Sequence, residues 1–443
     1  MLLNISYKNI WKIALPIIIS GVAQNVVTVT DTIFLGKLGN IELGAAGNAG
    51  IFYYVLVLSG LGFTTGTQII IGRRNGEQNY SQIGKVFDHT LYVIVPLSIL
   101  LFGCVQLFAP QLLESITQSE NILTAAINFL SYRIYGLFFA FILGCFIAFY
   151  VGTTKTKILI YVTVIMMFVN VFLDYSLIFG NFGFPKMGIK GAALASVISE
   201  ISALTFLILY TLKKIDINKY KLFRFKDFDK SIVKRITKVG GPIMLQNFLS
   251  ISSWFIFFMI IEKIGERELA ISHIIRSIYM VLMIPLFGFS SATNTLVSNL
   301  IGQGNSDKVL TLTARIILLS LACTFLVLFF NIFIPEQIIG LYTNDNSLII
   351  EAINSLNIIS GTMFFFAVSY IFFSAVSGTG NTKTALLIEF ITIAIYIVAC
   401  YYIAIIKQLD LPIVWCSEFI YFALLGIMSF GYLKWGNWGK VTI

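Results

Sequence analysis

The sequence predicts an all-α integral membrane protein with twelve transmembrane helices in two six-helix lobes related by an internal parallel repeat. Three observations predict this fold. Of the 443 residues, 58% are hydrophobic and only 12% are charged, whereas soluble domains carry about 25% charged residues. The apolar residues gather in runs long enough to cross a bilayer, which takes about 20 residues as a helix. Short motifs of the first half recur in the second half at one constant spacing.

Twelve apolar segments follow one another with no long polar domain between them. Six precede a basic loop and six follow it, and the loops between segments carry most of the charges. Each segment holds enough apolar residues to cross the bilayer as a helix. The predicted transmembrane helices are, in order, 12–36, 48–72, 86–109, 124–151, 158–180, 191–212, 239–261, 270–298, 309–334, 348–377, 385–406 and 413–433.

The distribution of positive charge predicts the orientation. Lys and Arg concentrate in the loops after the even-numbered segments and in the C-terminal tail, whereas the other loops are mixed or acidic. Because cytoplasmic loops carry such an excess, both termini are expected in the cytoplasm, with the chain integral to the plasma (inner) membrane of a bacterium or archaeon. The first twenty residues lack a small-residue cleavage site, so they are expected to stay as part of the first helix. The net charge of +9 then reflects topology, and no nucleic-acid partner is expected.

The loop after the sixth segment is the most basic part of the chain. Residues 213–238 hold ten Lys or Arg against three Asp. The predicted organisation is an N-terminal six-helix lobe (1–212), a basic cytoplasmic linker (213–238) and a C-terminal six-helix lobe (239–443). Within the linker, "DFDKSIVKRITK" is compatible with an amphipathic helix on the inner leaflet and equally with a solvated connection.

Three pairs of motifs show that the two halves repeat. "GKLGNIELGA" (36–45) matches "EKIGERELAI" (262–271), "GFTTGT" (62–67) matches "GFSSAT" (288–293), and "GTTKTK" (152–157) matches "GTGNTK" (378–383). All three pairs share one spacing, the repeat offset, which is also the spacing from Pro16 to Pro242. Two six-helix halves in the same orientation are typical of transporters that work by alternating access. A duplicated structural protein is the alternative.

Two carboxylates lie inside apolar segments of the first half at matching depth. Asp31 lies about six residues from the outer end of the first segment, and Asp174 about as far from the outer end of the fifth, or roughly 9 Å along a helix. Asn170 precedes Asp174 by one turn and so shares its face, and Ser196 is expected at a similar height on the sixth segment. A carboxylate at this depth is costly, so it is a functional hypothesis by default.

These four side chains, Asp31, Asn170, Asp174 and Ser196, are predicted to form a cation-coupling site. Oxygen ligands suit a proton or a hard cation such as sodium, and two carboxylates at close range cannot both keep a full charge, so one is able to carry a proton. Two alternatives stay open. Each Asp is a solvated cap, or it pairs with Arg133 at the outer start of the fourth segment.

The helix face of Asp31 carries two further polar side chains. Gln24 and Thr28 lie seven and three residues before Asp31, and they are candidate substrate-facing residues. The repeat offset carries Asp31 onto Phe257, and it carries Asn170 and Asp174 onto Tyr396 and Cys400. The second half therefore lacks this carboxylate set, and ion coupling is predicted to belong to the first half alone.

Other ionisable residues have weaker claims to function. Glu200, one turn after Ser196, is a candidate relay, with a structural ion pair as the alternative. Glu389 and Glu418 each lie about one turn inside a helix end and are expected to reach the membrane surface. Asp88 and His89 are expected to cap the start of the third helix.

Motifs of catalysis are absent from the sequence. No GxxxxGK[ST], HExxH or GxSxG motif occurs, and the five cysteines lie in apolar segments without metal-ligand spacing. No catalytic residue is predicted, the chain is not expected to be an enzyme, and no cofactor is expected. The only predicted metal is a sodium ion at Asp31, Asn170 and Asp174, as the alternative to a proton.

At these residues the chain resembles the multidrug and toxic compound extrusion (MATE) family over essentially its whole length. The resemblance is carried by Pro16 followed by "VTDTIFLGKLG", by the two "GTTKTK" and "GTGNTK" loops, by "NVFLDYSLIFG" continuing into "MGIKGAALASVIS", and by "GGPIMLQ". It implies a two-lobe, twelve-helix exporter of organic cations. It also implies a coupling role for Asp31, Asn170 and Asp174, and one for Ser196 if that residue corresponds to a Thr of the family's sixth helix.

The chain departs from one branch of that family in the second half. Members of that branch carry a Glu eight residues after the Pro of the seventh helix and an Asp in the tenth helix. Here Ser250 occupies the first position, and the tenth segment offers only Ser369 among apolar residues. A sodium site of that kind in the second lobe is therefore not expected.

The predicted function is secondary active antiport in multidrug efflux. Organic, often cationic, drugs and toxic compounds would leave the cell in exchange for protons or sodium ions, by alternating access in a monomer whose partners are small organic cations and membrane lipid. The alternative is a flippase for a lipid-linked saccharide or peptidoglycan precursor, which is less compatible with twelve helices and few buried Lys or Arg. A non-transporting membrane receptor or scaffold is the alternative from another class.

Overall fold

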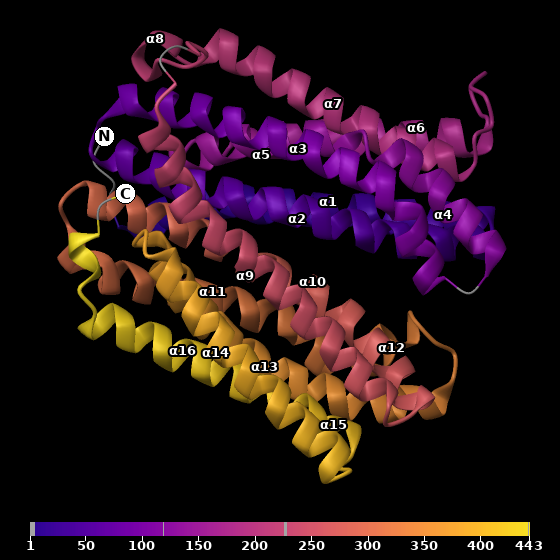
Figure 1. Ribbon diagram of the computed structural model, residues 1–443. Coiled ribbons are helices and arrows are strands. Elements are labelled where there is room, and N and C mark those ends of the chain that lie inside the picture. Colours follow the sequence, from indigo (N-terminus) through magenta and orange to yellow (C-terminus); the bar gives the residue numbers. More distant parts are fainter. Residues whose placement is uncertain (1–4, 118, 226–227, 442) are drawn as a thin grey trace. The chain divides into compact units, whose positions relative to one another are not determined.

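The computed structural model describes residues 5–117, 119–225, 228–441 and 443, and these form helices joined by short loops with no strand among them. Residues 1–4 of the predicted N-terminal lobe, and Lys226 and Asp227 of the predicted linker, lie outside the described residues. Figure 1 shows long helices running side by side within each half of the chain. The helices of the first half are α1 (Tyr7–Leu38), α2 (Asn40–Gly76), α3 (Tyr80–Ile116), α4 (Glu120–Arg133), α5 (Gly136–Gly152), α6 (Ile158–Phe179), α7 (Ile189–Lys214) and the short α8 (Ile217–Tyr220).

The helices of the second half repeat this order. The repeat offset carries both ends of α2 onto those of α10, and it carries the start of α4 and the end of α5 onto the two ends of α13. They are α9 (Lys230–Glu262), α10 (Glu266–Gly302), α11 (Val309–Phe333), the short α12 (Pro335–Gly340), α13 (Asn346–Gly378), α14 (Thr382–Tyr401), the short α15 (Leu411–Trp415) and α16 (Ser417–Trp435), with single helical turns at Ser306–Lys308, Tyr402–Ile406 and Trp438–Lys440.

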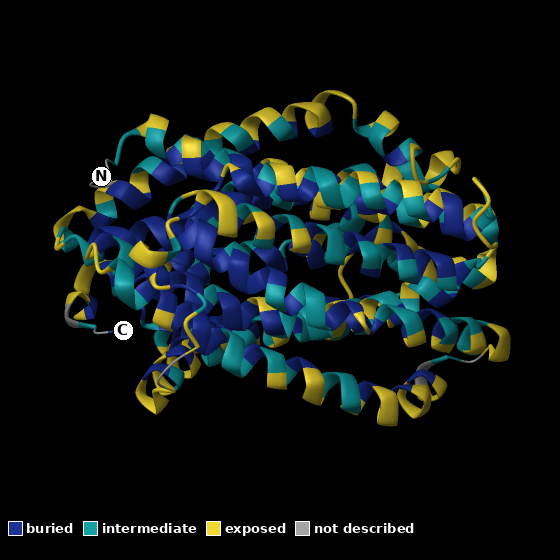
Figure 2. Ribbon diagram, turned by 90° about the horizontal axis from the view of Figure 1, so that it is seen from above, coloured by how far each residue is buried: buried dark blue, intermediate teal, exposed yellow. Residues whose placement is uncertain are grey.

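The predicted fold class is confirmed. Eleven helices among the described residues are long and apolar enough to cross a membrane, and α4 with α5 forms a twelfth span bent by 48°. Ten predicted segments lie within one of these spans, and the segments 158–180 and 309–334 each run one residue past the end of theirs. Most of the helices extend beyond the predicted ends. Large apolar side chains are exposed along these helices, as expected of a lipid-facing surface. Figure 2 shows the exposed residues of the chain in yellow.

The chain divides into two compact units, and the division falls inside helices. One unit comprises Ile19–Met244, and the other comprises residues up to Ile18 together with Leu245–Ile443. The boundaries at 18/19 and 244/245 are themselves related by the repeat offset, because each falls two residues after Pro16 or Pro242. The start of α1 therefore packs with the second half, where Trp11 meets Phe289 at a centroid distance of 5.9 Å. The lobe boundaries at 212/213 and 238/239 stay a prediction.

The unit of residues 19–244 is built around α2, which packs against α3, α4 and α5. α7 packs against α4, α5 and α6. A close approach joins α2 to the start of α9, because a Cβ on Gly66 would collide with the backbone of Gly240. In the other unit, α13 is central and packs against α10, α11 and α16.

Two side chains of α3 hold the described part of the linker. Asp88 accepts hydrogen bonds from the backbone N–H groups of residues 223, 224 and 225 at 2.9–3.1 Å. His89 Nε2 accepts one from the N–H of Asp229 at 2.8 Å. The predicted cap role of Asp88 and His89 is wrong, because α3 begins two turns earlier, at Tyr80. The part of "DFDKSIVKRITK" from Lys230 onward is helical and forms the start of the continuous helix α9, and its position on the inner leaflet stays a prediction.

Candidate functional site

Asp31 of α1 and the pair Asn170 and Asp174 of α6 come together inside the unit of residues 19–244. Asn170 and Asp174 are fully buried, and Asp31 is half-buried. The carboxyl of Asp31 lies within interaction range of both α6 side chains, without forming a hydrogen bond to either. Three of the four predicted coupling residues therefore meet in one place.

The polar atoms of this cluster lack ordinary partners among the described residues. Asp31 Oδ1, both side-chain polar atoms of Asn170 and both carboxyl oxygens of Asp174 are buried without a hydrogen bond. Buried polar groups are hydrogen-bonded in the great majority of cases, and each exception calls for an explanation. Leaving such a group unmatched costs about 1–3 kcal/mol. A cluster of unmatched oxygens is therefore suited to receive a proton or a small hard cation.

Local packing explains why α1 and α6 present these groups to each other. One turn after Asp31, the ring of Phe34 contacts Phe179 at 5.8 Å and Tyr175 at 6.3 Å between centroids, which joins α1 to the outer part of α6. α6 ends at Gly180, whose φ of +79° closes the helix in the left-handed conformation. This end places Asp174 near the last turns of the helix.

Small residues hold α7 tightly against α6. A Cβ on Gly191 would lie 2.7 Å from the backbone carbonyl group of Leu177, so only glycine permits this approach. Ser196 follows on α7 and is half-buried. Among the described residues no hydrogen bond joins the Ser196 side chain to the Asp31 cluster, and its role there stays a prediction.

Gln24 and Thr28 lie on α1 with exposed side chains. The hydroxyl of Thr28 donates a hydrogen bond to the backbone carbonyl of Gln24 at 3.3 Å. Both residues precede Asp31 on the same helix, so their candidate role in contacting a substrate stays a prediction.

Arg133 pairs with Glu200, not with the Asp31 cluster. Two guanidinium nitrogens donate to the two Glu200 oxygens at 2.6 and 3.2 Å, and both side chains are largely buried. Arg133 also donates to the hydroxyl of Tyr53 at 2.9 Å and stacks 3.9 Å over that ring. The structural ion pair considered for Glu200 is thus present, whereas a relay role stays a prediction.

The ion pair coincides with the bend between α4 and α5. A Cβ on Gly136, the first residue of α5, would collide with the Arg133 guanidinium and the Glu200 carboxyl. The guanidinium also acts electrostatically on Asp31. Arg133 therefore supplies positive potential near the Asp31 cluster while its own hydrogen bonds go elsewhere.

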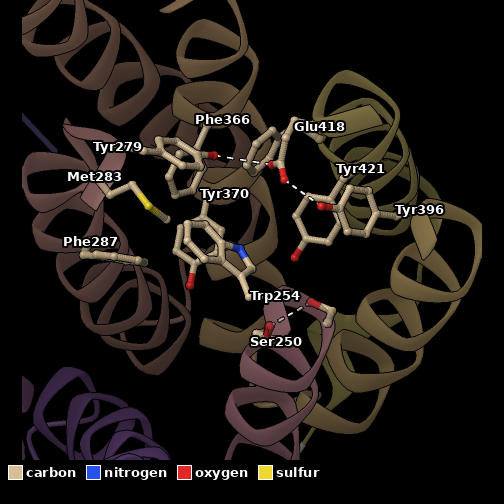
Figure 3. A pocket seen from close by; sticks show the side chains of 12 residues that line it. Ser250, Trp254, Tyr279, Met283, Phe287, Phe366, Tyr370, Tyr396, Glu418 and Tyr421 are labelled. Carbon is tan, nitrogen blue, oxygen red and sulfur yellow. Dashed lines mark hydrogen bonds between the residues drawn. The ribbon is translucent and has the colours of Figure 1, made fainter. Parts of the chain in front are cut away.

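The second unit contains two buried carboxyl groups whose environment the sequence did not predict. Glu418 and Glu389 are only 4% and 2% exposed, so the expectation that they reach the membrane surface is wrong. Glu418 Oε1 accepts from the hydroxyl of Tyr396 at 2.9 Å (Figure 3). Glu389 Oε1 accepts from the hydroxyls of Ser250 and Tyr421, each at 2.8 Å. Hydroxyl donors on neighbouring helices therefore stabilise both groups inside the unit, and sequence spacing alone does not identify such donors.

The described residues contain no candidate site for a transition metal. They contain no group of three or more His, Cys, Asp or Glu side chains placed to hold an ion. The Asp31 cluster offers two carboxylates and one amide, a set of oxygen ligands that fits sodium or a proton and does not favour zinc or copper.

Comparison with known proteins agrees with the internal repeat. The sequence model of the MatE family matches residues 16–176 and 242–402, two regions related by the repeat offset. The chain is 28% identical over 87% of its length to the "Probable multidrug resistance protein NorM" of Thermotoga maritima, covering 83% of that protein. It is 22% identical over 99% of its length to the "Probable multidrug resistance protein YoeA" of Bacillus subtilis, covering 96% of that protein.

Solved structures show the same fold at low identity. One, described as the "outward-facing conformation of a multidrug resistance MATE family transporter of the MOP superfamily", superposes with a TM-score of 0.91 at 20% identity, covering 98% of this chain and 97% of that one. A MOP superfamily transporter from Pyrococcus furiosus superposes with a TM-score of 0.89 at 20% identity, covering 97% and 95% of the two chains.

Proposed function

Because the chain belongs to the MatE family of multidrug efflux transporters, we propose that it is a secondary active antiporter. It exports organic, often cationic, compounds in exchange for protons or sodium ions. Asp31, Asn170 and Asp174 form the coupling site. The relatives named as multidrug resistance proteins support the substrate class, and the Asp31 cluster supports the coupling.

One observation carries the coupling proposal. Five buried side-chain atoms of the cluster, four of them oxygens, have no hydrogen-bond partner among the described residues. A structural cap or a structural ion pair would have satisfied them, as Glu200 satisfies Arg133. The unmatched oxygens are instead those that a transported cation would bind.

The geometry supports a mechanism in which ion binding reshapes α1. Asp31 stands on α1, whereas Asn170 and Asp174 stand on α6. A proton or sodium ion from outside compensates one of the two negative charges, which reduces the repulsion between the carboxylates and draws α1 toward α6. Pro16 interrupts the hydrogen bonding of α1 and supplies a place for the helix to bend. The movement expels the substrate, and release of the ion to the cytoplasm resets the cycle.

The flippase alternative is less well supported. A pocket for an anionic lipid-linked precursor needs unpaired positive charge. Arg133 is the buried cation nearest the Asp31 cluster, and its charge is compensated by Glu200.

Efflux from proteoliposomes tests the proposal. A fluorescent organic cation is loaded, and proton and sodium gradients are imposed separately on the wild type, Asp31→Asn, Asp174→Asn and the control Glu351→Gln. Glu351 is an exposed partner of Arg267, so its variant removes one carboxylate away from the cluster. We expect one of the two gradients to drive efflux, both Asp variants to abolish it, and the control to retain it. Normal efflux by folded Asp31→Asn and Asp174→Asn would overturn the coupling assignment.

A further inference from the structure

The described part of the basic linker packs along α3. Two aromatic rings of the linker contact successive parts of this helix: Tyr220 meets Tyr80 at 5.6 Å between centroids, and Phe223 meets Phe87 at 5.7 Å. Asp88 fixes the linker backbone between these contacts and the next ones by accepting three N–H groups. Because a helix rises about 1.5 Å per residue, the linker runs from the start of α3 toward the part of α3 that is predicted to enter the bilayer.

Two phenylalanine side chains of the linker are exposed at that level. Phe225 and Phe228 are 47% and 58% exposed, and their rings contact Tyr92 of α3 at 5.9 and 5.7 Å between centroids. The Tyr92 hydroxyl donates a hydrogen bond to the backbone carbonyl of Phe225 at 2.9 Å. Exposed phenylalanines next to basic residues are typical of segments that lie in the membrane–water interface. The linker is therefore suited to contact lipid headgroups.

Two lysine side chains from separate segments converge on the ring of Tyr220. Lys155, in the loop before α6, and Lys219, of α8, place their ammonium nitrogens 4.9 and 5.8 Å from the ring centroid. Lys219 also lies 4.0 Å from the centroid of Tyr80. Among the described residues neither ammonium group forms an ion pair. Two positive charges are thus held near each other on one aromatic surface.

The linker itself does not compensate this charge. Partial burial and the positive charge of Lys219 both lower the pKa of Lys155, and the charge of Asp216 acts in the opposite direction. The Asp216 carboxylate accepts the backbone N–H of Lys219 at 2.9 Å, so it caps α8. Lys221 and Arg224 follow with exposed side chains, and neither forms an ion pair with a residue that the structure describes. The segment therefore has an excess of positive charge that an anion would neutralise.

We propose that this surface binds the headgroup of an anionic phospholipid, with its phosphate on Lys155 and Lys219. Ammonium groups form charge-assisted hydrogen bonds to phosphate, and a bound anion relieves the repulsion between two like charges. This end of the chain is predicted to face the cytoplasm, where the membrane surface is negative and attracts basic segments next to membrane helices. A zwitterionic headgroup fits less well, because its own ammonium group would meet further positive charges of the linker.

The proposed lipid site goes beyond the antiport proposal and does not rest on it. Its residues lie in the loop before α6 and in the linker, whereas the coupling cluster consists of Asp31, Asn170 and Asp174. Loss of lipid binding and loss of coupling are therefore separable by experiment.

Native mass spectrometry of the purified full chain in an uncharged detergent tests the site. The probes are dioctanoyl phosphatidylglycerol and dioctanoyl phosphatidylcholine, which share acyl chains and a phosphate but differ in net charge. We expect the apparent Kd to be at least about tenfold lower for phosphatidylglycerol. Glycerol 3-phosphate, which lacks acyl chains, is expected to bind more weakly than phosphatidylglycerol. Equal binding of the two lipids would overturn the proposal, and so would binding of glycerol 3-phosphate as tight as that of phosphatidylglycerol.

Variants locate the site. Lys155→Gln/Lys219→Gln is expected to weaken phosphatidylglycerol binding about tenfold and to change phosphatidylcholine binding by less than about twofold. The matched control Lys308→Gln/Lys383→Gln removes the same charge from two exposed lysines of the second half, and both affinities are expected to stay within about twofold. If the folded Lys155→Gln/Lys219→Gln protein keeps its affinity for phosphatidylglycerol, the site is wrongly assigned. An equal loss in the control would show that net charge alone attracts the lipid, which also overturns the proposal.

Discussion

Asp174 and Glu418 are both buried carboxyl groups in membrane helices, but they differ in their hydrogen bonding. In the unit of residues 19–244, neither oxygen of Asp174 has a hydrogen-bond partner among the described residues. In the unit that contains residues 245–443, both oxygens of Glu418 accept tyrosine hydroxyls. The unbonded oxygens of Asp174 are able to bind an ion, whereas the oxygens of Glu418 are already occupied by hydrogen bonds that stabilise the fold.

The internal repeat shows that the two sites occupy equivalent backbone positions of the two halves and differ in their side chains. The repeat offset carries Asp31 and Asn170 onto Phe257 and Tyr396, whose rings stack at 6.0 Å between centroids and 23° between planes. The backbone therefore brings the same two positions together in both halves. In the first half, polar residues at these positions form the candidate ion site. In the second half, aromatic residues at these positions pack against each other, and the Tyr396 hydroxyl donates a hydrogen bond to Glu418.

The largest effect is expected from removing the buried positive charge of Arg133, which lies near the Asp31 cluster. Arg133→Leu leaves Glu200 buried without its partner, which costs about 3–5 kcal/mol of unfolding free energy. A denaturant titration of the detergent-solubilised protein measures the loss. The double variant Arg133→Leu/Glu200→Leu is the matched control, and it is expected to recover most of the stability because no unpaired charge is left. A small loss of unfolding free energy in Arg133→Leu would mean that this unit tolerates unpaired buried charges in general. The contrast between Asp174 and Glu418 would then say nothing about ion binding.

A smaller loss is expected from removing a hydroxyl donor in the second unit. Tyr396→Phe leaves Glu418 Oε1 without its 2.9 Å hydrogen bond, at a cost of about 1–3 kcal/mol for a buried group left unmatched. The same titration measures it. Tyr54→Phe removes a hydroxyl from an exposed ring and should change stability by no more than about 0.5 kcal/mol. Equal effects of the two variants would show that the Glu418 contact stabilises nothing.

Much of the fold follows from the sequence because lipid leaves few alternatives. Apolar runs of sufficient length must become helices, and the constant repeat offset predicts which helices correspond. The ends of several helices were underestimated, since charged residues near the surface continue a helix as easily as they end it, as Lys230 does at the start of α9. The bend between α4 and α5 was not predicted, because it depends on the contact of Gly136 with Arg133 and Glu200 across three helices.

The site was predictable where depth and helix periodicity suffice, and not where partners come from distant segments. Asp31, Asn170 and Asp174 were placed at matching depth by counting from helix ends, and the structure brings them together. The hydrogen-bond partners of Glu418 and Glu389 were missed, because they stand on four helices at no sequence spacing that signals contact. One available signal was the repeat, since its offset carries Tyr53, beside Arg133, onto Tyr279, beside Glu418.

Asn170→Leu sharpens the comparison by separating stability from transport. The substitution removes two buried polar atoms that have no partner and replaces them by an apolar group of similar size. We expect the unfolding free energy to change by less than about 1 kcal/mol or to rise, since no hydrogen bond is lost. Gradient-driven efflux from proteoliposomes is expected to fall at least about tenfold, because an oxygen ligand of the coupling ion is gone. Loss of stability together with unchanged transport would assign Asn170 a structural role.

The smallest effect concerns two carboxylates outside the membrane, Asp229 and Asp345, which both accept hydrogen bonds at the start of a helix. The Ser347 hydroxyl and the backbone N–H groups of Ser347 and Leu348 hold the pKa of Asp345 below its ordinary value, and the hydroxyl and N–H of Ser231 do the same for the pKa of Asp229. A carboxyl with a lowered folded-state pKa stabilises its helix start above its ordinary pKa, near pH 3.9, and this stabilisation is lost as the pH falls through the lower folded-state value.

Hydrogen exchange at the start of α13 measures this effect at Asp345. The protection factors of the Ser347 and Leu348 amides are expected to fall in the wild type as the pH is lowered below about 4. Asp345→Asn keeps a side-chain oxygen that is able to cap the helix but does not titrate, so its protection factors should stay level over the same range. A parallel decline in the variant would show that the carboxylate is not the cause. A level profile in the variant would establish that the hydrogen bonds to the Asp345 carboxylate stabilise the start of α13.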